Sequence, residues 1–151
     1  MRSLIDNEVL GSIAIQEVLR YCPEQKITLP NSLLVLPLLF NKRIRATLKN
    51  KNTKIIGCKD FILSHPNDLL GVRTLYQDLI ITSLNSQILA IELGIASLAG
   101  GYLELGSVIY SGIDAKEYGS IAADISLAAP NTSKILREDP VELYGNFRIP
   151  V

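Results

Sequence analysis

The side chains best suited to nucleophilic or metal chemistry are few and lie far apart in this sequence. His65 is its only histidine, and the neighbouring Ser64 and Pro66 provide no carboxylate to orient the ring, as a nucleophile–histidine pair requires. Cys22 and Cys58 are 36 positions apart, a spacing that matches neither a zinc motif nor a disulfide framework. We therefore expect no catalytic residue and no metal site, and we interpret both cysteines as buried apolar residues.

Glycine-rich phosphate-binding motifs are also missing from the sequence. The stretch "LAGGYLELG", residues 98–106, has three glycines but forms neither a G-x-G-x-x-G fingerprint nor a loop ending in Lys and Ser or Thr. The acidic run "EDPVE", residues 138–142, is short and is predicted to be a solvated turn rather than an acid–base pair. From these features we predict that the chain is not an enzyme and binds no cofactor.

Positive charge is concentrated in one segment. The chain has 15 basic and 15 acidic residues, but residues 41–60 contain seven of the basic residues and a single acidic one, Asp60. Charge segregated in this way is typical of an interaction surface, although a solvated helix face is the alternative. The candidate partner-binding residues are these seven: Lys42, Arg43, Arg45, Lys49, Lys51, Lys54 and Lys59. The apolar run "LLVLPLLF", residues 33–40, precedes them directly and is expected to form core and some interface.

Composition indicates a single globular domain, residues 1–151. Hydrophobic residues make up 48% of the chain, and its mean hydropathy of +0.26 predicts that some apolar surface contacts a partner. The run 33–40 is too short for a membrane of ~30 Å and contains Pro37. Asp6 and Glu8 stand where a signal peptide needs an uncharged core. We therefore expect a cytoplasmic protein without a membrane segment.

Helices are predicted for most of the chain before residue 66. Their spans, each with the residue expected to cap it, are 7–21 (Asp6 or Asn7), 29–40 (Asn31), 42–49 (Asn41) and 54–64 (Thr53). The second of these, in which Pro37 predicts a bend, could instead be a buried strand.

Two helices and a hairpin are predicted for residues 68–110. The first helix begins at Asp68. The second spans 83–99, ends at Gly100–Gly101 and directs five residues inward at helical spacing: Leu84, Ile88, Ile91, Ile95 and Leu98. Gly106–Ser107 then supplies the glycine-first pair of a type II′ hairpin turn. Helices over 115–129, capped by Asp114, and over 132–138 complete the chain. The predicted fold class is mostly α with one β-hairpin, an α+β domain.

The order helix, helix, hairpin over residues 68–110 matches a winged helix-turn-helix, which leaves a DNA-binding regulator as the alternative function. In that motif the helix before the wing enters the major groove. Here its one charge is Glu92, and the wing adds Glu104, opposite in sign to what phosphates require. A winged helix in this chain would therefore be degenerate.

Four stretches resemble one known family. They are "NEVLGSIAIQEVLRY" (7–21), "LPNSLLVLPLLFNKRIRATL" (29–48), "ILAIELGIASLAGGYLEL" (88–105) and "LYGNFRIPV" (143–151). All four are similar to stretches of the small middle components of bacterial three-component ABC systems, the antiviral defence assemblies that include Lamassu-like relatives. In these systems an SMC- or Rad50-like ABC ATPase, the middle component and an effector, often a nuclease, are encoded together.

The resemblance implies a function that the residues alone do not. It implies a non-catalytic adaptor that links the ATPase to the effector in an anti-phage or anti-plasmid complex and restrains the effector until foreign DNA is sensed. Its partners would be those two subunits, with DNA reached only through the complex and no cofactor or membrane involved. The seven basic residues of segment 41–60 would then serve protein–protein interaction.

Overall fold

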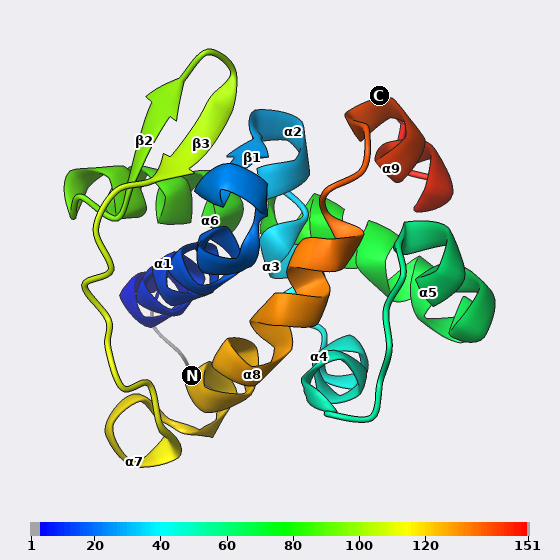
Figure 1. Ribbon diagram of the computed structural model, residues 1–151, viewed down its shortest axis with the longest axis horizontal. Helices are drawn as coiled ribbons and strands as arrows, with labels where there is room; N and C mark the ends of the chain where they lie inside the picture. Colours follow the sequence, from blue (N-terminus) through cyan, green and yellow to red (C-terminus); the bar gives the residue numbers. More distant parts are fainter. Residues whose placement is uncertain (1–3, 151) are drawn as a thin grey trace.

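The computed structural model describes residues 4–150, and helices form most of the regular structure (Figure 1). The helices are α1 (Leu4–Tyr21), α2 (Leu29–Ser32), α3 (Val35–Leu39), α4 (Lys42–Lys49), α5 (Cys58–Ser64), α6 (Leu69–Glu92), α7 (Ala115–Tyr118), α8 (Ser120–Ile135) and α9 (Pro140–Asn146). The strands β1 (Lys26–Thr28), β2 (Ala96–Ala99) and β3 (Tyr102–Leu105) form an antiparallel sheet in the order β1-β3-β2. The predicted α+β class, mostly helical with a hairpin, is confirmed. Residues 1–3 and 151 of the predicted domain lie outside the described residues.

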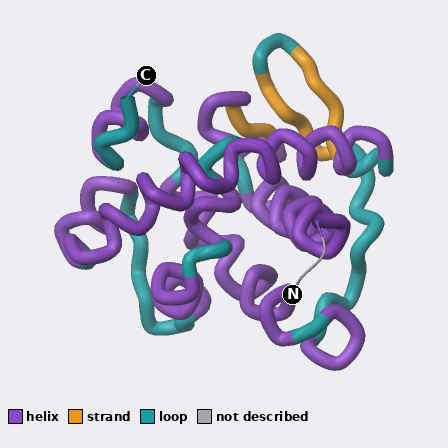
Figure 2. The backbone as a smooth tube through the Cα atoms, turned by 180° about the vertical axis from the view of Figure 1, so that it is seen from behind, coloured by secondary structure: helices purple, strands orange, loops and turns teal. Residues whose placement is uncertain are grey.

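The helices form layers around one continuous apolar core. In the middle, α1 contacts both α6 and α8, while α3 contacts α6, α4 and α8. Figure 1 shows α8 and α4 in front and α6 behind; seen from the other side in Figure 2, the long α6 crosses the front of the molecule. The outer layers therefore expose α6 on one face and α4 with α8 on the opposite face.

The apolar run 33–40 lies in the core but is not one bent helix. Helix α2 ends at Ser32 and α3 begins at Val35, so the break precedes Pro37 and the predicted bend there is wrong. Pro37 is the third residue of α3, where a backbone N–H has no helical partner in any case. The predicted cap is also wrong, because Thr28 caps α2 by accepting a hydrogen bond from Asn31 N.

Helix α4 confirms the prediction made from its cap. The side chain of Asn41 accepts hydrogen bonds from the backbone N–H groups of Arg43 (3.0 Å) and Ile44 (3.2 Å). The predicted start of the next helix is wrong, because α5 begins at Cys58 and not directly after Thr53. The chain is extended at Gly57, and a distant carboxylate, Glu138, accepts the Cys58 N–H at 3.0 Å.

Residues 69–92 form one helix of 24 residues, α6, where two were predicted. No glycine or proline occurs between Val72 and Glu92, so nothing interrupts the hydrogen-bond ladder. Helix α6 ends at Glu92, and Gly94 (φ 80°) closes it: Ile95 N donates to Ala90 O and Gly94 N donates to Ile91 O, the two bonds of a Schellman motif. The helix-turn-helix expected here is absent from residues 69–92, and the winged-helix hypothesis for this stretch is wrong.

The hairpin turn lies six residues earlier in the sequence than predicted. Its turn is Gly100–Gly101, both with positive φ (57° and 82°), as a type I′ turn requires. The predicted turn at Gly106 lies instead at the end of β3, where Gly106 N donates to Ile95 O at 2.6 Å. The other edge of β3 pairs with β1, with Lys26 opposite Glu104. No local pattern predicted β1, because its partner is far away in the sequence.

From residue 114 onward, the structure agrees with the prediction at the start of the first helix and differs after it. Asp114 caps α7 by accepting the Glu117 N–H at 2.8 Å, as predicted. Helix α8 then continues through Pro130, where an end was expected, to Ile135. The lost hydrogen bond of a helical proline costs stability, which extensive packing of α8 against α1 and α4 offsets. The tail forms α9, capped by Asp139 and not predicted.

None of the described helices combines the length and apolar composition that a bilayer crossing requires.

Candidate functional site

The single histidine and the two cysteines are packed against other residues of the fold. The His65 ring stacks on Phe61, with centroids 5.2 Å apart, and its Nδ1 lies 3.2 Å from Phe61 O. Both cysteines are buried and free. Burial raises the pKa of the Cys22 thiol to about 11 and that of Cys58 to about 12, so neither supplies a reactive thiolate near neutral pH. Across the described residues, no three metal-ligating side chains gather in one place.

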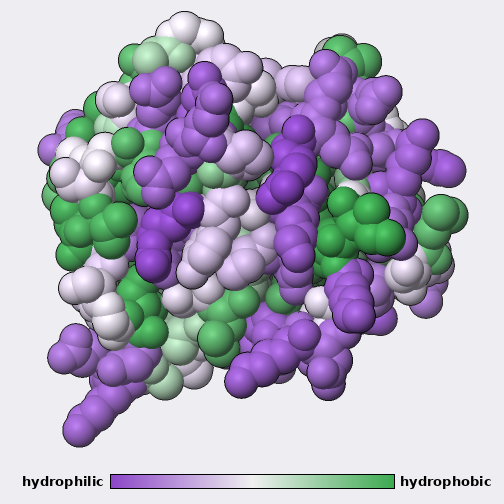
Figure 3. Space-filling model, in the orientation of Figure 1, coloured by the Kyte–Doolittle hydropathy of each residue, from purple (hydrophilic) through white to green (hydrophobic). Residues whose placement is uncertain are grey.

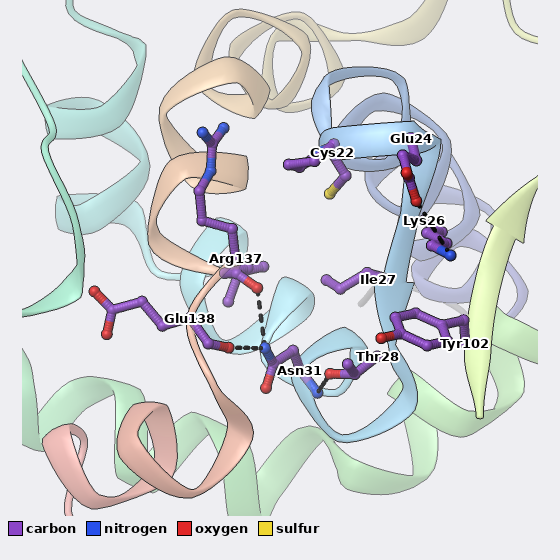
Figure 4. Close-up of a pocket in the computed structure, with 11 residues that line it drawn as sticks. Cys22, Glu24, Lys26, Ile27, Thr28, Asn31, Tyr102, Arg137 and Glu138 are labelled. Carbon is purple, nitrogen blue, oxygen red and sulfur yellow. Dashed lines mark hydrogen bonds and ion pairs between the residues drawn. The ribbon is translucent and has the colours of Figure 1, made fainter. Parts of the chain in front are cut away.

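A polar hollow of about 210 Å³ lies between β1 and the segment joining α8 to α9 (Figure 4). Its central side chain is Asn31, whose Nδ2 donates to Leu136 O (3.0 Å) and Glu138 O (2.7 Å). Figure 4 shows the charged ends of Arg137 and Glu138 directed away from Asn31. The hollow is smaller than the ~300 Å³ at which ligand pockets begin. Asn31 therefore fastens the linker to α2 rather than forming a ligand site.

The structure separates the seven candidate basic residues. Arg45 is buried, with an Nη1 that donates to Leu39 O at 2.9 Å, so its predicted place in a surface patch is wrong. The guanidinium of Arg43 is exposed and lies 3.5 Å from an Asp68 carboxylate oxygen. Lys42 on α4 and Lys59 on α5 are exposed elsewhere on the surface. The expected single patch on two helices is therefore divided.

One groove is lined by the remaining three candidates, Lys49, Lys51 and Lys54. It has a volume of about 470 Å³ and lies between residues 48–55 and α8; we call it the lysine groove. Its lining residues are Leu48, Lys49, Asn50, Lys51, Thr53, Lys54, Ile55, Leu127, Pro130, Asn131 and Lys134. Lys134 was missed from the sequence, because α8 brings it to the groove from far along the chain. Figure 3 shows hydrophilic residues gathered over α4 and α8 on this face.

The walls of the lysine groove are joined by defined contacts. Asn131 Nδ2 donates to Leu48 O at 2.9 Å and to Thr53 O at 3.4 Å, which ties the segment after α4 to α8. Lys49 Nζ lies 3.2 Å from Asp124 Oδ1, one ion pair between the same two helices. The groove is thus held open between elements that pack closely on each other.

Helix α6 is the second candidate surface, and its orientation reverses the prediction. Three residues expected to point inward, Leu84, Ile88 and Ile91, are exposed by 43%, 54% and 36%. Ile81, one turn earlier, is 65% exposed. These four residues, spaced by three, four and three positions, line one side of the helix and are called the α6 face. Beyond the end of the helix, Ile95 is buried as predicted, whereas Leu98 lies in β2 and is 59% exposed, so its predicted inward direction is wrong.

The opposite side of α6 is small and polar. Ser83, Ser86, Gln87 and Ala90 are buried against the rest of the molecule. Gln87 Nε2 donates to Ser32 Oγ at 2.6 Å, whereas the hydroxyls of Ser83 and Ser86 are buried without a hydrogen-bond partner. Over residues 81–91 the helix therefore turns small and polar groups inward and large aliphatic groups outward, whereas Val72 near its start is buried in the core.

An apolar groove of about 660 Å³ continues the α6 face. It lies between α6, α2 and α9, with Leu84 shared by both surfaces and Leu33, Tyr76 and Val141 among its walls. Tyr76 and Tyr144 meet edge to face, their centroids 5.6 Å apart. Burial raises the pKa of the Tyr144 hydroxyl, which donates to Pro30 O. The groove and the α6 face form one apolar surface.

No protein-family model, curated protein or solved structure matches this chain. The two surfaces are therefore defined by the geometry of this molecule alone.

Proposed function

We propose that this chain is a non-catalytic adaptor subunit whose α6 face binds another protein. The observation that carries the proposal is the reversed orientation of α6, with Ile81, Leu84, Ile88 and Ile91 in water. Scattered apolar residues are normal on a surface, but a continuous apolar stripe beside an apolar groove is typical of an interaction site.

Energetics support this interpretation. Complete burial of a large aliphatic side chain stabilises by about 1.5–3 kcal/mol, and about half of that is forgone at the α6 face, whose four side chains are 36–65% exposed. The unpartnered hydroxyls of Ser83 and Ser86 add a cost of about 1–3 kcal/mol for each unsatisfied buried group. Both features oppose the stability of the isolated chain. A partner that covers the α6 face would recover the first of them.

The two candidate surfaces lie on opposite faces, an arrangement suited to bridging. Helix α6 lies behind the core, and α4 and α8 lie in front of it (Figures 1 and 2). Residues of α4 and α8 line the lysine groove. The resemblance to middle components supplies the partners in this proposal: an SMC- or Rad50-like ABC ATPase and an effector such as a nuclease. The chain would act in the cytoplasm, restrain the effector until foreign DNA is sensed, and meet DNA only through the complex.

Six of the seven sequence-predicted residues stay in the proposal as partner-binding residues, since buried Arg45 leaves the set. They are Lys42, Arg43, Lys49, Lys51, Lys54 and Lys59. The alternative, a winged-helix DNA-binding regulator, has no structural observation in its favour, because residues 69–92 are one helix and carry a single basic residue, Arg73.

Co-purification tests the adaptor proposal. The ATPase and effector that the proposal expects to be encoded beside this chain are co-expressed with wild type or with Leu84→Ser/Ile88→Ser, which changes only exposed side chains. We expect the variant to keep its thermal midpoint and to lose its partners. The matched control is Ile56→Ser/Leu63→Ser, whose side chains are 85% and 82% exposed and do not belong to the α6 face. Full assembly of the α6 variant, or neighbouring genes that encode no such subunits, would contradict the proposal.

A further inference from the structure

The lysine groove combines positive charge with apolar surface. Its charged residues are Lys49, Lys51 and Lys54 on one wall and Lys134 on the other. Leu48 and Ile55 are buried at its base, and Leu127 is 59% exposed on the α8 side. An occupant must therefore be anionic and must also offer an apolar group.

Most of the positive charge in the groove is not neutralised by the chain itself. No acidic residue lines the groove, and Asp124 pairs with Lys49 from outside the lining. Within the described part of the chain, Lys51, Lys54 and Lys134 take part in no ion pair. Like charges around one hollow repel each other, so an anionic occupant would both gain attraction and relieve that repulsion.

The chemistry of the groove favours protein over nucleic acid. A phosphodiester backbone is anionic but has no apolar group to place against Leu127. The lining contains no arginine, the residue that most often makes specific contacts with base edges. The chain as a whole has no net positive charge, whereas nucleic-acid affinity depends on an extended basic surface.

From these observations we infer that the lysine groove binds an acidic segment of a partner protein that inserts a leucine-like side chain beside Leu127. The inference rests on the proposed adaptor role, and it places the second partner on the face opposite α6. Complementary charge would steer the segment to the groove. The apolar contact would fix its register.

Fluorescence anisotropy with the full chain tests the inference. The probe is a short labelled peptide of Glu and Asp with two leucines; the comparison probes replace the leucines by serine, or the acids by lysine. We expect the acidic leucine peptide to bind most tightly and to lose affinity as salt is added. Lys51→Gln/Lys54→Gln/Lys134→Gln should weaken binding about tenfold, since exposed pairs of ~0–1 kcal/mol each add to roughly 1.4 kcal/mol.

A matched charge control separates the groove from net charge. Arg73→Gln/Lys116→Gln/Arg148→Gln removes the same number of positive charges from exposed positions outside the groove, and its affinity should match wild type. Equal loss in both triple variants would overturn the inference, as would equal binding of the serine peptide. If a short labelled DNA duplex binds wild type more tightly than the peptide does and fails to bind the groove variant, that result would show a phosphate site instead.

The outcome is distinguishable from failure of the adaptor proposal. Peptide binding is measured on the isolated chain and does not depend on the α6 face. If Leu84→Ser/Ile88→Ser assembles fully while the groove binds the peptide, the adaptor proposal fails and the groove inference stands. If the α6 variant loses its partners and no peptide binds, the groove inference alone is overturned.

Discussion

Gly11 of α1 packs directly against Ser86 of α6, with no room for a side chain between them. A Cβ atom placed on Gly11 would lie 2.0 Å from Ser86 Oγ and 2.7 Å from Ser86 Cβ. Both residues are buried. Because this contact needs small side chains on both helices, it fixes which side of α6 faces the core. It thereby leaves the α6 face exposed to solvent.

Gly11→Ala should destabilise the domain by about 1–3 kcal/mol, because the added methyl group overlaps Ser86 and the helices must move apart. The gain in helix propensity, up to about 1 kcal/mol, opposes only part of this loss. Chemical denaturation measures the difference. Gly145→Ala in α9 is the control: its Cβ meets nothing within 4 Å, so stability should be unchanged or higher. The double variant Gly11→Ala/Ser86→Gly should recover part of the loss, and an undamaged Gly11→Ala would show that the helices are farther apart.

Gln16 holds the segment that follows the hairpin onto α1. Its Oε1 accepts the N–H groups of Ile109 and Tyr110, both at 2.9 Å, and its Nε2 donates to Tyr110 O at 2.8 Å. Gln16→Ala should cost about 1–3 kcal/mol and should speed amide hydrogen exchange at both positions. Gln77→Ala, an exposed residue of α6, should change neither quantity. Unaltered exchange at Ile109 and Tyr110 would mean that this segment is held by other contacts.

Local signals predicted the elements that local interactions stabilise. The basic helix α4 and the first turn of α7 were located correctly because Asn41 and Asp114 hydrogen-bond within their own helices. The first turn of α5 was not, since its cap is Glu138, far away in the sequence. Strand β1 was not predicted for the same reason, since its three residues acquire strand structure only by pairing with β3.

Helix α6 shows where hydrophobic periodicity misleads. The stripe Leu84, Ile88, Ile91 has the spacing of a core-facing helix side, but the core side is made of Ser83, Ser86 and their neighbours. Periodicity identifies an apolar side without telling whether the chain's own core or another molecule covers it. Gly94 was the available signal for the helix end. In the candidate site, Lys49, Lys51 and Lys54 were predicted, whereas Lys134 depends on tertiary structure.

The buried thiols should make the domain less stable in alkali. Burial raises the folded-state pKa of Cys22 to about 11 and of Cys58 to about 12, from an ordinary value of 9.0. The folded chain thus keeps these protons at pH values where the unfolded chain releases them. Their contribution is complete below pH 9.0 and is lost as the pH rises toward 12, by about 1 kcal/mol per thiol near pH 10.

Urea denaturation near pH 8 and near pH 10 measures this dependence. The variant Cys22→Ala/Cys58→Ala should lose less stability between the two pH values than wild type does. Both thiols should also react slowly with a disulfide reagent in the folded chain and rapidly in urea. Rapid reaction of the folded chain, or equal alkaline loss in the variant, would show that the thiols are accessible.

Ile88 and Ile95 offer a matched comparison within one apolar stripe of the sequence. Ile95 is fully buried and Ile88 is 54% exposed. Ile95→Ala should therefore cost about 2–5 kcal/mol through the cavity it leaves, while Ile88→Ala should cost less than about 1 kcal/mol in the isolated chain because its side chain already meets water. Denaturant midpoints measured under identical conditions give both values. In the assembled complex Ile88→Ala should have a larger effect than in the isolated chain. Since the proposed partner buries Ile88, its truncation should lower the affinity of assembly. Equal and large losses for both variants of the isolated chain would place Ile88 in the core and remove the exposed α6 face on which the adaptor proposal depends.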